Sequence, residues 1–290
     1  MKVLFIINPV SGGKEKRDWE EQIRAYFNAS PHTMEFFLLT GKSDEASVRH
    51  HLDSVRPDRI VAVGGDGTVK MVAEIIQDKS IPLGIIPAGS ANGMARELSI
   101  PLDVNEALEV AVNGREQTID VIRINNKEIC LHLSDLGLNA MLVKEFEKSK
   151  KRGMWGYGRA IFKVLWEKRK MHVTIHTDEE THRRKAYMVV LANARKYGTG
   201  ANINPEGDVS DGYFEIVVVR KIHLIEIYKS ILTNRSFHPN RIEVFQTKKA
   251  SLSTLKRTHF QVDGEYRGKI TQLTAEIVPA RLTIMLPVEA

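Results

Sequence analysis

Cysteine is nearly absent from the chain, since Cys130 is the only one among 290 residues. A single cysteine cannot form an intramolecular disulfide or a cysteine-based zinc site, which excludes disulfide-stapled secreted scaffolds and fits a reducing compartment. Long hydrophobic runs are also missing: no segment approaches the roughly 18 apolar residues needed to cross a bilayer. The apolar run at residues 3–7 is too short for the core of an export signal. We therefore expect a cytoplasmic protein that does not span a membrane.

The composition is that of a folded protein, with 42% apolar and 27% charged residues. At a prior of roughly 150 residues per domain, the length predicts about two domains. Lys and Arg number 42 and Asp and Glu 36, which gives a formal net charge of +6. This balance favours anionic partners, namely nucleotide phosphates, nucleic acid or an acidic membrane surface.

Strand-like and helix-like segments alternate up to about residue 120. The predicted strands are 2–7, 34–39, 59–63 and 83–86, and the predicted helices are 18–27, 43–55, 69–77 and 94–98. Such alternation predicts a parallel α/β sheet covered on both faces, forming an N-terminal domain over residues 1–120.

Closely spaced strands dominate the chain from residue 121 onward. The predicted strands are 121–124, 128–133, 173–176, 186–192, 213–219, 241–245, 259–262, 273–278 and 281–286, and the helical exceptions are 155–170 and 222–232. An Asn-Asn-Lys turn at 125–127 separates the first two strands. The pattern predicts a mostly antiparallel, β-sandwich-like domain over residues 121–281.

A glycine-rich block, Gly-Gly-Asp-Gly-Thr at 64–68, lies between a predicted strand and a helix expected to begin near Val69. Glycines let backbone amides approach an anion, and the helix N-terminus adds positive potential. A carboxylate such as Asp66 beside phosphates makes sense if it helps to hold Mg²⁺. Taken alone, the block also fits an ordinary strand-to-helix turn. The block at 64–68 is not a Walker loop. The Gly-Lys pair at 13–14 does not belong to a Walker loop either, because Glu15 follows it where the motif has Ser or Thr.

Two more glycine-containing turns follow predicted strands, at residues 8–12 and 87–93. The carboxyl ends of parallel strands meet at one edge of the sheet, where ligands bind in open α/β folds. Three such turns at corresponding strand ends therefore predict a single phosphate-binding crevice.

Together these blocks resemble the lipid kinases whose catalytic domain is shared by diacylglycerol kinases and sphingosine kinases. Asn-Pro at 8–9 with Ser-Gly at 11–12, the block at 64–68 and Gly-Ser-x-Asn at 89–92 match the three nucleotide-binding blocks of that family in order. The resemblance extends to Asp-Gly-Tyr at 211–213 and Asp-Gly-Glu at 263–265. The block at 64–68 alone is shared with NAD kinases, whereas the combination is specific.

The resemblance implies an ATP-dependent lipid kinase with ATP on the first domain and a general base supplied across a cleft by the second. The nucleotide-binding residues carried over are Asn8, Pro9, Ser11, Gly12, Thr40, Gly64, Gly65, Asp66, Gly67, Thr68, Gly89, Ser90 and Asn92. The last strand, at about 282–290, is expected to return to the first domain. Phospholipid biosynthesis is the metabolic setting that the resemblance implies.

Glu265 matches the general base of the family, and Asp263 and Asp66 complete the expected catalytic set. An alcohol that attacks the γ-phosphorus needs a positioned carboxylate to accept its proton. Asp263 and Glu265, two apart on a strand, are expected to share a face. On spacing alone, residues 262–265 are more typical of a plain hairpin turn.

The resemblance also implies a Mg²⁺ site away from the reacting phosphate. Asp211 would bind the ion together with the backbone carbonyls of Asp208 and Tyr213. Hard oxygen ligands suit Mg²⁺. Without the resemblance, an Asp-Gly turn before a strand explains these residues equally well.

One departure concerns the acceptor. Diacylglycerol kinases usually have Asp after the Asn of the third block, whereas this chain has Gly93. A small residue there, like Ser90, is closer to the sphingosine-kinase side of the family. The resemblance therefore implies a diacylglycerol-like or a sphingoid-like lipid as the acceptor.

Basic and aromatic residues alternate between Lys144 and Lys170. They predict peripheral contact with an acidic membrane surface, or else a core-packing helix with a basic solvated face. No nucleic-acid module accompanies them, so we expect no nucleic-acid partner. The oligomeric state stays open, a homodimer included.

Two other functions remain open. One is a kinase for a soluble acceptor of the NAD-kinase type, which shares the block at 64–68. The other is a catalytically silent, nucleotide-binding protein that associates with membranes, which Gly93 leaves open.

Overall fold

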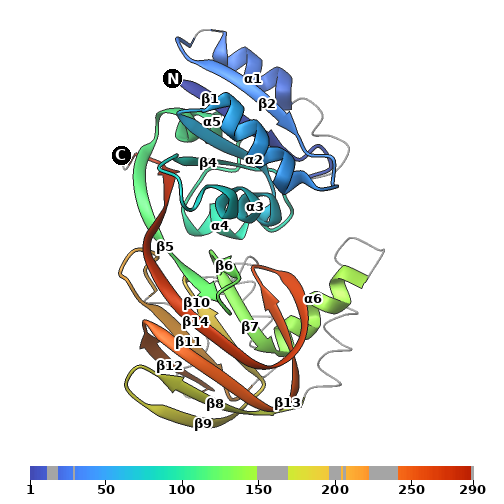
Figure 1. Ribbon diagram of the computed structural model, residues 1–290, viewed down its shortest axis with the longest axis vertical. Helices are drawn as coiled ribbons and strands as arrows, with labels where there is room; N and C mark the ends of the chain where they lie inside the picture. The colour runs from blue at the N-terminus through green and yellow to red at the C-terminus, as the bar shows by residue number, and fades with distance from the viewer. Residues whose placement is uncertain are drawn as a thin grey trace. The chain divides into compact units, whose positions relative to one another are not determined.

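The structure, a computed structural model, describes residues 1–11, 19–28, 30–148, 169–195, 204, 207–221 and 241–288, without the side chains of 146–148 (Figure 1). The chain divides into two compact units. Unit 1 comprises Met1–Asp120 and Ala280–Ala290, and unit 2 comprises Val121–Pro279. Gly12, the helix expected at 222–232 and all but the last two residues of the helix expected at 155–170 lie outside the described residues.

A parallel sheet in the order β14-β4-β3-β1-β2 forms the centre of unit 1. Its strands are β1 (Lys2–Ile7), β2 (Thr33–Leu38), β3 (Arg59–Gly64), β4 (Leu83–Pro87) and the end of β14 (Glu265–Leu286). Nearly every residue of β1, β3 and β4 is buried, as expected for parallel strands covered on both faces. Each fully buried Val or Ile there contributes roughly 1.5–3 kcal/mol of hydrophobic stabilisation.

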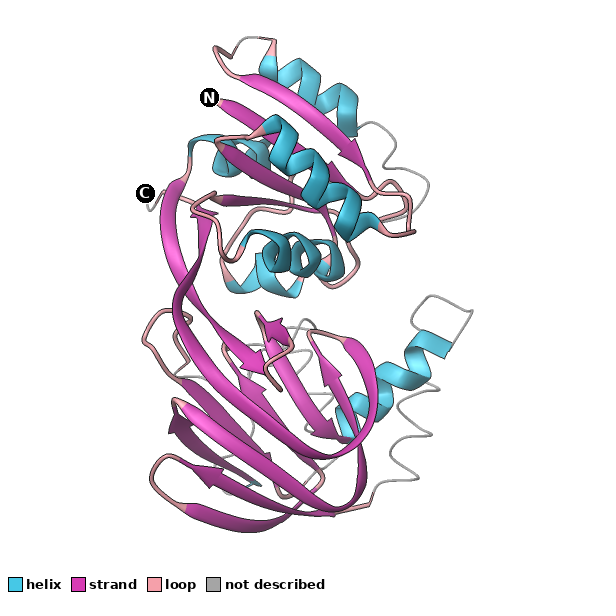
Figure 2. Cartoon of the chain, viewed as in Figure 1, coloured by secondary structure: helices cyan, strands magenta, loops and turns pink. Residues whose placement is uncertain are grey.

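Helices follow the strands of unit 1 in alternation (Figure 2). They are α1 (Trp19–Phe27), α2 (Asp44–Val55), α3 (Asp66–Ile76), α4 (Gly93–Glu97) and α5 (Val104–Asn113). The long ones are amphipathic; α2, for example, buries Val48, Leu52 and Val55 at helical spacing. Helix α3 begins at Asp66 rather than near Val69, so the Asp-Gly-Thr part of the glycine-rich block forms its first turn.

Unit 2 is a mostly antiparallel β-structure with one described helix. Its remaining elements are β5 (Arg115–Ile124), β6 (Glu128–Cys130), β7 (Leu133–Gly137), α6 (Leu138–Lys148), β8 (Met171–Thr177), β9 (Thr181–Ala186), β10 (Met188–Ala192), β11 (Phe214–Val219), β12 (Ile242–Thr247) and β13 (Lys249–Val262). The mixed α/β fold with a β-rich C-terminal domain is confirmed.

Strand β13 connects two groups of strands in this unit. Its first half pairs with β8, whereas its last three residues pair with β7. Apolar side chains from β8 (Ile175), β10 (Val189), β11 (Phe214) and β13 (Leu252) belong to one buried core. The strand expected at 259–262 is thus the end of a longer one, and the two expected at 273–278 and 281–286 are parts of β14.

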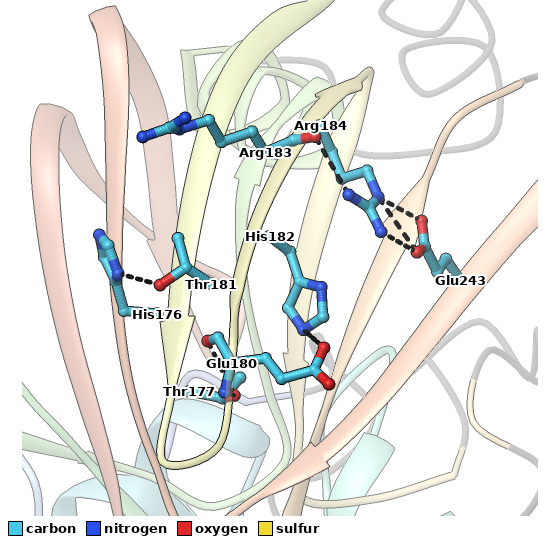
Figure 3. Close-up of polar contacts among 8 residues, drawn as sticks. All are labelled: His176, Thr177, Glu180, Thr181, His182, Arg183, Arg184 and Glu243. Carbon is cyan, nitrogen blue, oxygen red and sulfur yellow. Dashed lines mark hydrogen bonds and ion pairs between the residues drawn. The ribbon is translucent and has the colours of Figure 1, made fainter.

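Two strands at open sheet edges, β9 and β12, are joined by side chains (Figure 3). The Arg184 guanidinium donates from Nε to both carboxylate oxygens of Glu243, at 3.0 and 2.8 Å. The His182 ring stacks on Phe245, with ring centroids 3.9 Å apart. Side-chain contacts therefore link strands that have no backbone pairing with each other in the described part of the chain.

The chain crosses between the units twice, on β5 and on β14. It leaves unit 1 after Asp120 and returns at Ala280. The Ala280 amide, on a residue with a φ of 48°, donates a hydrogen bond of 2.7 Å to the Asp120 carboxylate. The exit and the return are therefore held side by side.

Candidate active site

The loops that follow the four N-terminal parallel strands leave the sheet at a common edge. The Asn8 backbone amide donates to the Val63 carbonyl at 2.9 Å, and the Ala88 backbone amide donates to the Gly64 carbonyl at 2.8 Å. The Leu39 amide bonds to the Ile7 carbonyl at 2.8 Å, which places Thr40 at the same edge. The structure thus brings the turns after β1, β2, β3 and β4 together.

Two of these turns touch through glycine backbone. A Cβ on Gly89 would lie 2.5 Å from the Gly65 Cα, a separation that Cβ atoms do not adopt. The side chain of Asn92 closes the second turn, because its Oδ1 accepts from the Gly89 amide at 2.8 Å and its Nδ2 donates to the Gly89 carbonyl at 3.0 Å. Ser90, which lies between Gly89 and Asn92 in the sequence, is exposed. Glycine is therefore required where the loops meet.

The first turn of α3 faces this edge. The amides of Thr68 and Val69 bond to the Gly65 carbonyl at 2.9 and 3.1 Å, so Asp66 and Gly67 occupy the helix N-terminus, where backbone N–H groups favour an anion. The Asp66 carboxylate accepts the Met94 amide at 3.1 Å and thereby connects α3 to α4.

Asn8 contacts the same helical turn. Its Nδ2 donates to the Thr68 hydroxyl at 3.2 Å, and its Oδ1 accepts the Val10 amide at 3.2 Å. The Thr68 residue is only 6% exposed. Through Asn8, Thr68 therefore connects the first turn of α3 to the loop that carries Pro9 and Ser11.

Asp44 organises the turn that carries Thr40. Its Oδ1 accepts both the amide and the hydroxyl of Thr40 at 2.9 Å, and its Oδ2 accepts the Gly41 amide at 2.7 Å. The Thr40 amide is the largest cause of a lowered pKa at Asp44, with further hydrogen bonds in the same direction. Our sequence prediction omitted Asp44, although its spacing of four residues after Thr40 is typical of a local cap.

In unit 2, Asp263 and Gly264 form the turn between β13 and β14, with φ values of 49° and 82°. Two positive φ angles are typical of a type I′ hairpin turn. The expectation that Asp263 and Glu265 share a strand face was wrong, because Asp263 lies in the turn and only Glu265 lies on β14. The hairpin alternative describes these residues.

The Asp263 carboxylate holds the segment between β6 and β7. It accepts the backbone amides of Leu131, His132 and Leu133 at 3.0, 2.9 and 3.3 Å, and the Cys130 thiol at 3.3 Å. The Asp263 amide returns a bond to the Leu133 carbonyl at 3.0 Å. In this structure Asp263 anchors the loop beside the predicted base.

Glu265 is the first residue of β14 and pairs with Val262 across the turn. Its Oε2 accepts a charged hydrogen bond of 2.6 Å from Arg267, which in turn contacts Glu128 on β6. Our sequence prediction included neither Arg267 nor Glu128. Because Glu265 and Arg267 are two residues apart on a strand, their side chains lie on one face, and the sequence spacing indicates their contact. Glu128 is remote in sequence, so no local pattern indicates its contact with Arg267.

The predicted metal ligand Asp211 lies in the turn before β11. Its Oδ1 accepts the Tyr213 amide at 2.9 Å, and its Oδ2 accepts from Gln246 at 3.3 Å. Gln246 also donates to the buried Glu215 at 3.2 Å. Burial raises the pKa of Glu215; its hydrogen bonds oppose this, and the negative charge of Asp211 adds to the rise.

The ligands predicted for a Mg²⁺ ion in this turn are all oxygens, namely the Asp211 carboxylate and the carbonyls of Asp208 and Tyr213. The Asp208 carboxylate itself accepts the Ser210 amide at 2.9 Å. Oxygen ligands are those that Mg²⁺ prefers. No cluster of three or more His, Cys, Asp or Glu side chains suited to a metal occurs among the described residues, so a metal here would depend on backbone carbonyls.

The geometry agrees with two family models that together span nearly the whole chain. Residues 2–124 match the model described as diacylglycerol kinase catalytic domain, and residues 135–286 match the one described as YegS C-terminal NAD kinase beta sandwich-like domain. The chain belongs to the diacylglycerol kinase family of lipid kinases. The resemblance inferred from the motifs is confirmed.

Individual relatives support this membership. A protein named diacylglycerol kinase from Staphylococcus saprophyticus is 29% identical over 220 residues, covering 73% of this chain and 72% of the relative. A protein of the same name from Staphylococcus aureus strain bovine RF122 / ET3-1 is 27% identical over 275 residues, covering 92% of this chain and 86% of the relative. A lipid kinase of this family uses a nucleotide phosphoryl donor and a lipid acceptor.

Solved structures share the fold. A diacylglycerol kinase from Bacillus anthracis strain Sterne superposes with a TM-score of 0.73 at 20% identity, covering 98% of this chain and 96% of the other. A second structure from the same strain gives a TM-score of 0.78 at 23% identity, covering 98% and 97%. In the described part of this chain, no helix is long and apolar enough to cross a bilayer.

Proposed function

We propose that this lipid kinase transfers the γ-phosphoryl group of ATP to a lipid hydroxyl, with Glu265 as the general base. The observation that carries the proposal is the convergence of the turns after β1, β3 and β4 at one sheet edge, together with the N-terminus of α3. Backbone amides and a helix N-terminus suit a phosphate chain. Asn8, Ser11, Thr40 and Ser90 belong to the same edge and complete the proposed ATP site, with Gly12 assigned from the sequence.

The proposed reaction needs a proton acceptor as well as a phosphate site. As the lipid hydroxyl oxygen attacks the γ-phosphorus, its proton passes to the Glu265 carboxylate. The bond between the γ-phosphorus and the β,γ-bridging oxygen breaks, and ADP leaves. Unit 1 supplies the phosphate site and unit 2 supplies the base, so catalysis requires both units.

Mg²⁺ has two proposed places in this scheme. Asp66, at the N-terminus of α3, would help to hold a cation that neutralises the phosphates when it is bound. Asp211, with the carbonyls of Asp208 and Tyr213, would hold a second cation that fixes the turn before β11. The donor atoms of both places are oxygens, which suits this metal.

The relatives' names favour diacylglycerol as the acceptor. Gly93 is a reason to test a sphingoid base as well. It is the first residue of α4, next to Met94, whose amide donates to Asp66, and it brings no carboxylate to this position. The family description of residues 135–286 includes NAD kinase, which makes NAD the soluble acceptor to test.

We also propose peripheral contact with an acidic membrane. Residues 121–279 carry 28 Lys and Arg against 17 Asp and Glu, whereas the rest of the chain carries 14 against 19. Within unit 2, Leu255 is 80% exposed where the pairing of β13 with β14 is interrupted. Lys256 and Arg257 follow it, a combination that suits an acidic bilayer surface. The basic and aromatic residues that led to this expectation, at 149–168, lie outside the described residues.

The decisive experiment offers labelled ATP with vesicles that contain diacylglycerol, a sphingoid base or neither, and with NAD in solution. We expect labelled lipid from wild type and a loss of more than about 100-fold in Glu265→Gln, because general-base catalysis contributes on the order of 10²–10⁴. Undiminished transfer by Glu265→Gln would remove Glu265 as the base. Phosphorylation of NAD alone would replace the lipid acceptor, and ATP binding without transfer to any acceptor would favour a silent nucleotide-binding protein.

Vesicle sedimentation tests the membrane contact separately. We expect binding to anionic vesicles that weakens with salt, because charges at a surface are screened over about 8 Å at physiological ionic strength. The variant Leu255→Asp should weaken binding, whereas Val10→Asp, at an exposed apolar residue of unit 1, is the matched control. Salt-insensitive binding would contradict the electrostatic part of the proposal.

A further inference from the structure

A single guanidinium lies between two carboxylates at the start of β14. Arg267 Nη2 donates to Glu265 Oε2 at 2.6 Å, and Arg267 Nε donates to the two carboxylate oxygens of Glu128 at 3.2 and 3.0 Å. The same Nη2 lies 3.0 Å from Glu128 Oε2. Arg267 therefore contacts Glu128 through Nε and Nη2, and it contacts Glu265 through Nη2.

The burial of this triad decides what the contacts can do. The side chains of Arg267, Glu265 and Glu128 are 34%, 43% and 24% exposed. Burial by itself would lower the pKa of Arg267, but its hydrogen bonds to Glu128 and Glu265 outweigh burial and raise it. Arg267 is therefore a permanent cation, and its planar fork restricts the orientation of any carboxylate that it binds.

The three residues come from two separate elements. Glu265 and Arg267 lie on β14, two residues apart and on one strand face, whereas Glu128 lies on β6. Glu128 fixes Arg267 to a neighbouring element, so Arg267 does not simply follow the motion of the Glu265 side chain. Such a support is what a precisely aimed catalytic group needs.

We infer that Arg267 is a positioning residue for the proposed base: it holds the Glu265 carboxylate through Oε2, and Glu128 holds Arg267 in place. This inference rests on the role proposed for Glu265. With Oε2 engaged, the substrate proton is assigned to Oε1.

Other ionisable groups around the turn are committed elsewhere. The Asp263 carboxylate accepts amides of residues 131–133 and the Cys130 thiol. On β13, His259 is hydrogen-bonded to Tyr266 at 2.7 Å, and Lys144 of α6 lies 5.8 Å from the centre of the Tyr266 ring. Among the described residues, Arg267 is the cation paired with Glu265, which makes it the group to vary.

The experiment measures the pH dependence of kcat/KM with diacylglycerol vesicles for Arg267→Gln, Arg267→Lys and Glu128→Gln. The acidic limb of such a profile reports the essential base of the free enzyme. Removing the cation in Arg267→Gln should move this limb to higher pH. Removing the competing carboxylate in Glu128→Gln should move it to lower pH.

Rates complete the expected result. Arg267→Gln should lower kcat about 10- to 100-fold without changing the KM for ATP, because misaligned catalytic groups cost on that order. Arg267→Lys keeps the charge and should restore the acidic limb more fully than kcat, since an ammonium lacks the fork. Lys269→Gln removes one positive charge from an exposed residue of the same strand and should leave the profile unchanged.

The outcomes separate this inference from the function on which it rests. If Glu265→Gln retains full activity, the proposed base is wrong. If Glu265→Gln is inactive while Arg267→Gln and Glu128→Gln keep the wild-type profile and kcat, only the inference falls. Equal shifts in both Gln variants, or the same shift in Lys269→Gln, would also overturn it. Thermal melting checks folding, and Arg267→Lys keeps the test informative if Arg267→Gln unfolds.

Discussion

The Asn8 side-chain amide donates a hydrogen bond of 3.2 Å to the Thr68 hydroxyl and so joins the loop after β1 to the first turn of α3. These residues belong to two different blocks that we propose bind the nucleotide, and they are 60 residues apart in the sequence. The contact couples the blocks, so a change in either one is expected to reach the phosphate site as a whole.

Thr68→Val removes the acceptor for Asn8 and keeps the shape of the side chain. We expect the KM for ATP to rise about fivefold, since one hydrogen bond contributes about 1 kcal/mol. Asn8→Ala should cost at least as much, and the double variant should cost less than the sum. A steady-state ATP titration of all four proteins measures the coupling. Strictly additive effects would show that the two residues act independently.

Gly89→Ala places a Cβ 2.5 Å from the Gly65 Cα and 2.8 Å from Asn92 Oδ1. One of the two turns must therefore move, and we expect ATP affinity to fall by more than about tenfold, which is 1.4 kcal/mol. Binding of a fluorescent ATP analogue measures the loss. Ala91→Ser adds an atom at an exposed position of the same turn and should bind normally; equal losses in both variants would contradict the steric explanation.

Asp263→Asn tests the structural role of the turn carboxylate. Asn tolerates the positive φ of this position, so the variant removes charge without straining the hairpin. We expect a loss of about 2 kcal/mol in unfolding free energy, because hydrogen bonds to a charged group contribute on the order of 1.5–3 kcal/mol. Asp178→Asn, whose carboxylate accepts one amide and one hydroxyl, should lose less in the same thermal melts. An unchanged melting temperature in Asp263→Asn would leave catalysis as the role of Asp263.

Glu243 should make stability depend on pH. Its pKa is lowered, first by the hydrogen bond from Arg184, so its contribution is fully present above the unfolded pKa of about 4.3 and is lost as pH falls through the folded pKa. We expect at most about 1 kcal/mol, because the pair is partly solvated. Thermal melts of Glu243→Gln should lose this acidic dependence. Glu276→Gln, which breaks an exposed 3.8 Å pair with Lys249, should behave as wild type.

Mg²⁺ should stabilise the protein through Asp211. A ligand that binds only the folded state at 100 times its Kd raises stability by about 2.7 kcal/mol. We expect Mg²⁺ to raise the melting temperature of wild type and of Asp208→Asn, because only the backbone carbonyl of residue 208 is a proposed ligand. Asp211→Ala should respond less. An identical response of Asp211→Ala would place the stabilising cation elsewhere.

Local patterns in the sequence predicted most of unit 1. Strands β1, β3 and β4 are continuous apolar runs ended by glycine or proline turns, and such runs are typical of a buried parallel sheet. Helix α5 was not predicted, although Asp103 caps it by accepting the amides of Asn105 and Glu106. The start of α5 was therefore indicated in the sequence by its N-cap residue, Asp103.

Unit 2 was less predictable because its strands depend on pairing rather than on pattern. Polar and apolar residues alternate from Lys249 to Ser253, where β8 and β14 provide backbone partners, but the alternation stops before Thr258, so the pattern does not show that one strand continues to Val262.

The same limit applies to the candidate site. Thr40 and Asp44 are close in sequence, whereas Arg267 and Glu128 are 139 residues apart. A contact between distant, exposed charges leaves no periodicity in the chain, so the sequence predicted Glu265 but not its support.

The hydrogen bond between the Ala280 amide and the Asp120 carboxylate makes unit 2 an insertion with adjoining ends. A short turn between residues 120 and 280 would close unit 1 with little loop entropy. The final strand beside β4 would be retained in such a graft, whereas truncation after residue 120 would delete it. Unit 1, which we propose binds the nucleotide, therefore has one fixed pair of attachment points, at residues 120 and 280, where a different domain can replace unit 2 without changes to the sheet.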